Sequence, residues 1–519
     1  MNYNDIFLII LIVLSWSIII IALAPEINKT KHFSTLGPAL MIKSTKNKGI
    51  LDAVAKHLPA KQIGKISTIL VVLGGLLAFG MLMYEAILLT IIHIPTSEAP
   101  PLNEYLALPL INPFIPLGYG TASLVFAVVI HEMFHGIVAR KQGIKVNSVG
   151  GLFFIIPVGA FVEPDEKEIM AADPVVRRRI VAAGPGINLI IAAICIVLLV
   201  FVMMPVSAPV HSGIYVEDST AIDAGHAIPK GMEIISYGNI SGKALNSLED
   251  TSMITPGLAN VTLFNGKAET NKSVPTGVAI VDLISGCPAE KAGVPSDSII
   301  YNISDAAGSH IIYNVDTLGN VLDKIAPGTQ INMTVETFNG TMAYKTYSMK
   351  TVSTYSYYAK DDPTANKAVY KSESFIGVEI DYSGVGYVSI DSLHSLVFGG
   401  QIAGPEFYET LGLPLLGLSP IPGSLAHLFH TPFNSYIFFG IANSLYWIFW
   451  IDFLLGIMNA LPLSILDGGQ FFKDTLTIAS RREKFKFLRN ENNVRKIYYA
   501  IGIFVFMLLM YIIIAPRVI

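Results

Sequence analysis

The chain has 519 residues, of which 52% are hydrophobic and only 14% are charged. Soluble domains carry about 25% charged residues, so this composition, with a mean hydropathy of +0.55, excludes an ordinary cytosolic enzyme and indicates a membrane protein. A net charge of −4 supplies no basic surface, so nucleic acid is not an expected partner. Cys195 lies in an apolar run and Cys287 in a polar segment, so the two cysteines form no disulfide framework.

Six apolar runs are long enough to cross a bilayer as helices of about 20 residues. The first run follows Asp5 and has no Lys or Arg before it, unlike a signal peptide, so we expect it to remain in the mature protein. The lipid bilayer is therefore the expected surrounding of a polytopic helical protein. The runs cover residues 6–24, 68–94, 114–139, 180–206, 433–458 and 498–515.

Basic residues in the loops predict the orientation of these runs. Residues 25–67 contain eight lysines, while the next loop, 95–113, contains no Lys or Arg. Because cytoplasmic loops are enriched in Lys and Arg, the first loop is predicted to be cytoplasmic. The same count places the basic residues at 140–145, 177–179 and 473–496 on that side. We therefore expect a multi-pass cell-membrane protein.

The segment 207–430 differs from the rest of the chain. It has 11 Lys, no Arg and 22 Asp or Glu, a net charge of −11, and lies outside the cytoplasm in this topology. Within it, two series of short motifs recur at a period near 70 residues, which indicates two copies of a small domain. The first series is Ala224-Gly225, Met232–Ile235, Pro256-Gly257 and Phe264–Gly266, and the second is Ala292-Gly293, Ser298–Tyr301, Pro327-Gly328 and Phe338–Gly340.

Short β-branched runs between Gly, Pro and Asn predict that both copies are β-rich. The stretch Gly286–Gly293, followed by Ser298-Ile299-Ile300, resembles the signature of PDZ domains. That resemblance implies a groove near Ile376 and Gly377 that accepts a peptide C-terminus by strand addition. A PDZ-like spacer that binds no peptide is the alternative.

The third apolar run contains His131-Glu132-Met133-Phe134-His135, an H-E-x-x-H pattern. In a helix, residues i and i+4 share one face, so both imidazoles can bind one Zn²⁺ while the adjacent Glu132 reaches its water. Ionisable residues inside a membrane are costly and mark functional sites. The run therefore predicts one zinc ion per chain, bound by His131 and His135, with Glu132 as general base.

Catalytic zinc takes three protein ligands, so a third ligand must come from another segment. The candidates are Glu85, Asp452, Asp467, His427 and His430. Asp467 is favoured because Pro462 breaks the helix at the end of the fifth run. A broken helix at membrane depth is tolerated where it lines a cavity.

These residues resemble the site-2 protease family of intramembrane zinc metalloproteases. The family motifs are H-E-x-x-H and N-x-x-P followed by D-G, which here are His131–His135, Asn459–Pro462 and Asp467-Gly468. Gly184–Asn188 looks like the Gly-Pro-x-x-Asn motif of its middle core helix, and Gly150–Phe161 looks like its membrane-embedded β-loop. PDZ modules between the middle and last core helices are also a family feature. The helices at 6–24 and 68–94 lie outside the shared core.

The resemblance implies hydrolysis of a peptide bond within or near a transmembrane helix of a single-span, membrane-tethered protein. Cleavage requires local unwinding, and the freed backbone needs new partners. We expect the strand edge at Gly159 and the Asn459 amide to bind substrate, and Asn188 to support the metal ligands. The alternatives are a re-entrant turn at 149–161 without a substrate role, and helix capping or packing by the two amides.

The predicted fold is thus about six membrane helices with a re-entrant β-loop and an α+β tandem PDZ-like domain outside the cytoplasm. The active site is expected toward the cytoplasmic side. A non-enzymatic receptor or divalent-metal carrier is the alternative function, but such a protein has no need of Glu132. The predicted segments are 1–110 (first helices and basic loop), 111–206 (core with His131), 207–274 and 275–395 (the two modules), 396–432 (connector), 433–475 (core with Asp467) and 476–519 (basic segment and last helix).

Overall fold

The structure of this protein is a computed structural model. It describes residues 3–30, 32–44, 48–91, 99–107, 109, 111–154, 156–219, 228–245, 255–338, 342–356, 373–382, 385–399, 407–421 and 423–518. The chain divides into two compact units. The first unit comprises residues 1–201, 414–420 and 440–519, and the second comprises 202–413 and 421–439.

Five of the helices in the described part of the chain are long and apolar enough to cross a membrane. They correspond to the second through sixth predicted runs. The first run forms α1 (Tyr3–Ile27), but its described apolar stretch, Leu11–Ile27, is shorter, so a crossing by α1 stays a prediction. The five helices are α3 (Ala60–Ile91), α4 (Leu117–Lys141), α7 (Ala183–Leu198) with the π-turn Leu199–Met203, α15 (Ser435–Asn459) and α17 (Glu491–Val518).

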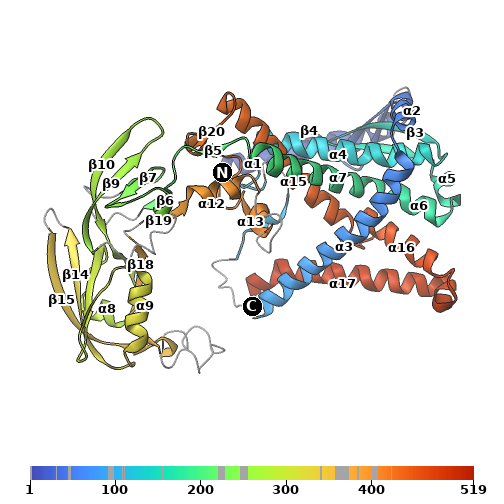
Figure 1. Cartoon of the computed structure of the whole chain (residues 1–519). Coiled ribbons are helices and arrows are strands. Elements are labelled where there is room, and N and C mark those ends of the chain that lie inside the picture. Colours follow the sequence, from blue (N-terminus) through green and yellow to red (C-terminus); the bar gives the residue numbers. More distant parts are fainter. Residues whose placement is uncertain are drawn as a thin grey trace. The chain divides into compact units, whose positions relative to one another are not determined.

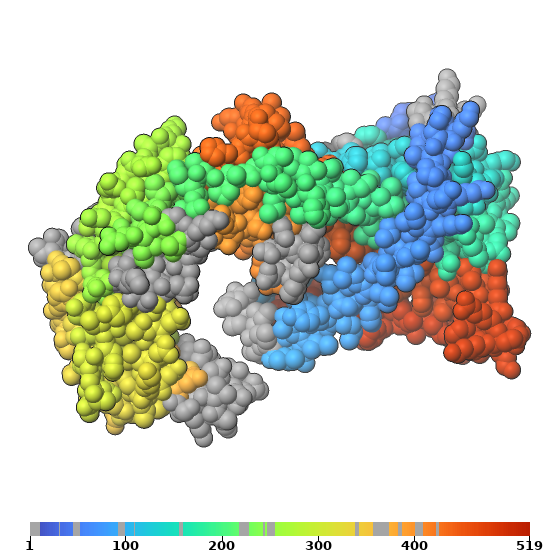
Figure 2. Space-filling model, in the orientation of Figure 1, coloured from blue at the N-terminus to red at the C-terminus, as the bar shows by residue number. Residues whose placement is uncertain are grey.

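Helix α3 has the surface that a lipid-facing helix requires. Its large apolar side chains, such as Ile69, Leu73 and Leu76, are exposed along most of its length, and the helix is visible as the blue rod on the surface in Figure 2. Outward apolar side chains are favourable only where the surroundings are themselves apolar. The first unit therefore has the surface of an integral membrane protein.

Shorter elements connect the long helices. The run predicted at 180–206 is divided at Ala182, where a separate helix, α6 (Pro174–Val181), ends and α7 begins. Asp173 caps the N-terminus of α6 by accepting a hydrogen bond from the amide of Val175. Helix α15 ends at Asn459, before Pro462 as predicted, and α16 (Asp467–Ala479) begins at the acidic residue of the D-G motif. The remaining short helices of this unit are α2 (Lys48–His57), η2 (Leu102–Tyr105), α5 (Glu166–Ala171) and η5 (Glu483–Arg489).

The glycine-rich segment 149–161 lies in a hairpin that belongs to a larger sheet. Strands β3 (Val146–Phe154) and β4 (Ile156–Pro164) are joined by β1 (Phe33–Leu36) and β2 (Ala39–Ser44) in the antiparallel order β1-β2-β3-β4. The two additional strands come from the basic loop that follows α1, and the sequence analysis did not anticipate them. Helix α4 packs against β4, and Figure 1 draws the two side by side. The re-entrant character of the hairpin stays a prediction.

The second unit contains two antiparallel sheets with the same strand order. The first is β10-β9-β7-β6-β19 with β8 beside β7, and the second is β15-β14-β12-β11-β18 with β13 beside β12. Each sheet covers its own apolar core. Their bounds are β6 (Ile214–Ser219), β7 (Glu233–Tyr237), β8 (Ile240–Ser241), β9 (Gly257–Phe264), β10 (Glu269–Thr276), β11 (Val278–Leu283), β12 (Ser298–Ser304), β13 (Ser309–Ile311), β14 (Gln330–Phe338), β15 (Met342–Lys350), β18 (Val378–Tyr382) and β19 (Val385–Ser389).

The sequence repeat corresponds to equivalent strands. Met232–Ile235 leads into β7 and Ser298–Tyr301 into β12, while Phe264 and Phe338 end β9 and β14. Ala224-Gly225 lies outside the described residues. One strand departs from the predicted segments: residues 385–389, within the predicted module 275–395, form β19 and pair with β6 of the first sheet. The second module is thus an insertion in the first, because the strand that completes the first sheet follows it in the chain.

Short elements complete the second unit. Helix α9 (Val315–Lys324) covers the second sheet, and the segment predicted as a connector contributes α13 (Phe407–Gly412), α14 (Gly423–Ala426) and β20 (Phe429–His430), which pairs with β5 (Ala208–Pro209). The others are η4 (Gly242–Leu245), α8 (Pro288–Lys291), β16 (Val352–Ser353), β17 (Ser374–Phe375) and α12 (Ile390–Val397).

Candidate metal centre

The two histidines of the H-E-x-x-H pattern lie on one face of α4. Their ring centroids are 4.8 Å apart, and only 8% of the His131 side chain and 14% of the His135 side chain are exposed. The i, i+4 spacing predicted this placement.

Asp467 is the residue that the fold brings to this pair. Its Oδ2 atom lies 2.9 Å from Nε2 of His131 and 3.1 Å from Nε2 of His135. Three atoms that bind one tetrahedral ion at about 2.0–2.2 Å are about 3.3 Å apart, so this spacing fits a shared metal. Among the described residues, these three form the only group of at least three His, Cys, Asp or Glu side chains whose possible ligand atoms all lie within 4.8 Å of one another, and Glu85, Asp452, His427 and His430 do not belong to it.

The ionisation of Asp467 suits a metal ligand. Burial raises the pKa of this carboxyl, but the charge of His135 and the hydrogen bonds from both imidazoles outweigh burial, so the pKa lies well below its ordinary value. Asp467 is therefore ionised, which is the form that binds metal ions.

A backbone carbonyl orients one of the imidazoles. Nδ1 of His135 lies 2.8 Å from the carbonyl oxygen of Ile180 in α6. Because a carbonyl only accepts, Nδ1 carries the proton and donates it, which directs Nε2 toward Asp467. Such a partner fixes the tautomer and the ring plane of a metal-binding histidine. This contact could not be predicted from the sequence, since every residue type has a backbone carbonyl.

Gly184 leaves the space that the two imidazoles occupy. A Cβ atom at this position would lie 2.3 Å from Nε2 of His135 and 2.6 Å from Nε2 of His131. Any other residue would therefore displace the two nitrogens that approach Asp467. We call the space between the Gly184 backbone and the two Nε2 atoms the Gly184 cradle. The donor set of two imidazoles and one carboxylate, with this space beside it, fits Zn²⁺.

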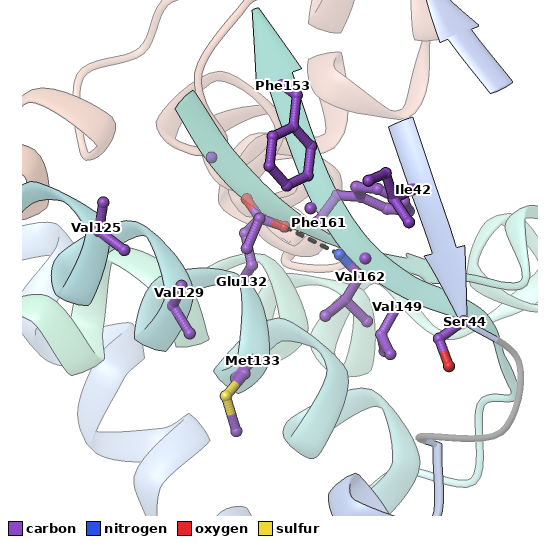
Figure 3. A pocket seen from close by; sticks show the side chains of 14 residues that line it. Ile42, Ser44, Val125, Val129, Glu132, Met133, Val149, Phe153, Phe161 and Val162 are labelled. Carbon is purple, nitrogen blue, oxygen red and sulfur yellow. Dashed lines mark hydrogen bonds between the residues drawn. The ribbon is translucent and has the colours of Figure 1, made fainter. Parts of the chain in front are cut away.

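Glu132 lines a pocket of about 540 Å³ in the first unit. Figure 3 shows its carboxylate directed from α4 toward β4, where Oε2 accepts a hydrogen bond from the amide of Val162 at 3.4 Å. Most of the lining is apolar, and Ile42 and Ser44 of β2 contribute to it. These two residues could not be predicted from the sequence, because no local motif links β2 to α4.

The other predicted site residues of the first unit have different surroundings. Gly159 lines the pocket on β4, and Asn459 is the last residue of α15. Asn188 is fully buried in α7, one turn after Gly184, and neither polar atom of its side chain has a hydrogen-bond partner among the described residues. Asp452 is likewise buried without a partner, while Glu85 is exposed.

In the second unit, Ile376 and Gly377 line an apolar groove of about 190 Å³ between α9 and β18. Strand β18 is the end strand of its sheet in the described residues. Gly377 has a φ of +78°, and a Cβ atom there would lie 2.1 Å from Cβ of Cys287. Only glycine fits this position, because the backbone is left-handed and the neighbouring strand-to-helix turn is in contact.

Comparisons with known proteins agree with this site. The chain is 32% identical over 241 residues to an uncharacterized protein of Methanocaldococcus jannaschii, an alignment that covers 46% of this chain and 62% of that relative. The chain thus matches less than two thirds of the relative's length. The profile of peptidase family M50, the site-2 protease family, matches residues 119–509, which include α4, α7 and α16. Because this match covers most of the sequence, the chain belongs to peptidase family M50, a family of intramembrane metalloproteases.

Proposed function

We propose that this protein is an intramembrane zinc endopeptidase that cleaves a single-span protein within or near its transmembrane helix. The observation that carries the proposal is the convergence of His131, His135 and Asp467 on one point, with Glu132 on the same helix facing a pocket. Residues 336 positions apart in the chain meet there. A structural role alone gives no reason to bury two imidazoles of a membrane helix against a carboxylate.

The residues of the site divide the chemistry between them. His131, His135 and Asp467 would hold Zn²⁺, which as a Lewis acid activates water and polarises the scissile carbonyl. Glu132 takes a proton from that water and delivers it to the departing amine. The Val162 amide restrains the Glu132 carboxylate from β4.

The pocket beside Glu132 fits an unwound, apolar stretch of substrate. Strand β4 is the end strand of its sheet in the described residues, so its free edge provides backbone partners for an extended chain. Gly159 on this strand leaves room for such a chain. The Asn459 amide would bind the substrate backbone, and Asn188, unsatisfied beside the Gly184 cradle, would support the metal ligands.

Charge in the loops supports the proposed sidedness. Lys141 ends α4 and Lys473 lies within α16, and basic residues beside membrane helices favour the cytoplasmic face. We therefore propose that water enters from that face, while the acidic tandem module of the second unit lies outside the cytoplasm.

Metal removal tests the proposal. Detergent-purified protein should contain about one zinc per chain, and a chelator should abolish cleavage of a single-span substrate. Zinc added back should restore cleavage, whereas Mg²⁺ should not, because it prefers oxygen ligands. Cleavage that persists after complete removal of metal would contradict the proposal.

Substitution of Gly184 is expected to weaken zinc binding strongly. In Gly184→Ala the new Cβ would overlap both Nε2 atoms. We therefore expect the zinc dissociation constant to rise at least about 100-fold, which is the largest effect typical of substitutions around metal ligands. Competition with a chromogenic chelator measures the constant. Gly80→Ala on α3 is the matched control, because its Cβ would meet no atom within 4 Å. Equal zinc affinity in the two variants would contradict the proposed cradle.

We further propose that the groove between α9 and β18 binds an apolar peptide C-terminus, by the strand addition that PDZ-like modules use. Gly319 of α9 lines the groove, and a Cβ there would meet open space. Gly319→Leu should therefore fill the groove without disturbing the fold and reduce peptide affinity about tenfold or more. Gly319→Ala is the matched control.

Fluorescence anisotropy of labelled peptides with apolar C-termini measures this affinity on the full-length protein. A free carboxylate should bind better than the amide. If neither peptide binds the parent, the module is a spacer.

A further inference from the structure

Helix α6 contacts both halves of the metal centre. The carbonyl oxygen of its Ile180 accepts a hydrogen bond from Nδ1 of His135, with 2.8 Å between the two atoms. One turn earlier on the same helix, Nε of Arg177 donates to both carboxylate oxygens of Asp474, at 2.8 and 3.0 Å. Asp474 belongs to α16, the helix that begins with Asp467. One short helix thus joins the histidine helix to the helix that carries the third ligand.

The pair Arg177–Asp474 is buried, which distinguishes it from an ordinary surface ion pair. Only 1% of the Asp474 side chain and 14% of the Arg177 side chain are exposed. Desolvation makes such a pair a weak source of stability, and apolar side chains of similar volume often stabilise a protein as well or better. Because the planar guanidinium contacts both carboxylate oxygens, the pair fixes the orientation of α16 relative to α6.

The orientation of α16 also sets the position of Asp467, because Asp467 and Asp474 belong to the same helix. Asp467 and Asp474 are seven residues apart, so they lie on the same face of the helix, two turns from each other. Phe471, between them, is buried, and the guanidinium of Arg178 lies 5.6 Å from the centre of its ring. Rotation or tilt of α16 relative to α6 would therefore move the Asp467 carboxylate relative to His131 and His135.

We propose that the Arg177–Asp474 ion pair positions the Asp467 carboxylate against the two histidines, so that its main role is the geometry of the metal centre. This inference rests on the proposed zinc site. Arg177 and Asp474 are positioning residues, because they act through α16 and α6 and do not touch the metal. Ligand groups must be held within about 0.5 Å of the productive arrangement. A directional contact between two rigid helices provides this precision.

The proposal is tested by a variant that keeps the packing between α6 and α16 but removes the directional ion pair. In the double variant Arg177→Met with Asp474→Leu, apolar contact replaces the ion pair, and thermal unfolding should show a Tm close to that of the parent. We expect its zinc dissociation constant to rise about 10–100-fold. The visible absorption spectrum of the Co²⁺-substituted protein should also change, because it reports the ligand geometry. Arg177→Lys, which keeps the charge but not the fork, should show a smaller change of the same kind.

The chain offers a matched control between the same elements. Arg481, just after α16, contacts Asp173, the N-cap of α6, at 2.7 Å, but both side chains are about half exposed. Arg481→Gln removes this second pair and should leave zinc affinity within about twofold and the Co²⁺ spectrum unchanged, as expected for exposed ion pairs.

The outcomes separate the two proposals. A stable double variant with the zinc affinity and Co²⁺ spectrum of the parent would overturn the positioning role while leaving the zinc site intact. If the double variant fails to fold, Arg177→Lys carries the test by the same two measurements. A parent that binds no zinc would overturn the proposed metal centre, and the positioning role with it.

Discussion

Glu132→Gln is expected to abolish cleavage while leaving zinc bound. The glutamine has nearly the same shape but cannot accept a proton from water, and loss of a general base costs about 10²–10⁴ in rate. The metal ligands are unchanged, because Glu132 is not one of the three residues of the proposed metal group. Single-turnover cleavage of a single-span substrate and the zinc content of the same sample measure the two effects.

This experiment also separates the enzyme from a metal carrier or receptor that uses the same ligands. A carrier needs the ligands but no general base, so its transport would survive Glu132→Gln. Glu132→Asp is the informative control, because it keeps a base but shortens its reach, and should recover part of the lost rate. Cleavage by Glu132→Gln at the parental rate would remove Glu132 from the mechanism.

Asp467→Ala is expected to remove both zinc and activity. The carboxylate is the one ligand from outside α4, and its loss leaves two imidazoles, fewer than the three protein ligands of catalytic zinc sites. Zinc affinity should fall by more than about 100-fold, since even the loss of a residue that only hydrogen-bonds a ligand lowers metal affinity about 10–100-fold. Elemental analysis after dialysis, alongside the cleavage assay, measures the result.

Asp452→Asn is the matched control for Asp467→Ala. Asp452 is also an acidic residue in the same half of the core, but it does not belong to the group formed with the two histidines. Its substitution should leave zinc at about one per chain. Stoichiometric zinc in Asp467→Ala would instead mean that the third ligand is misassigned, and would return Asp452 and Glu85 to consideration.

The sequence predicted the elements whose causes are local. Apolar length indicated five helices that the structure contains, and the helix break before Asp467 followed from Pro462. The i, i+4 spacing put His131 and His135 on one face, because helical periodicity depends only on neighbouring residues. The internal repeat likewise corresponded to two sheets of equal strand order.

The helix break at Pro462 favoured Asp467 among several candidates for the third ligand, and the family resemblance agreed with that choice. The residues by themselves left several acidic and histidine side chains available, since no rule of sequence spacing connects positions more than 300 residues apart. Only packing of α16 against α6 brought Asp467 within 3.1 Å of both imidazoles.

Tertiary structure alone decided the remaining features of the site and the strand order of the second unit. The Ile180 carbonyl, the addition of β1 and β2 to the pocket sheet, the pairing of β19 with β6 and the Arg177–Asp474 pair all join segments distant in sequence. Composition and periodicity determined that this chain is a membrane protein with two histidines on one face of a helix, because burial in lipid and helical geometry act over short stretches. The arrangement that completes a catalytic centre depended on long-range packing, which these local patterns do not encode.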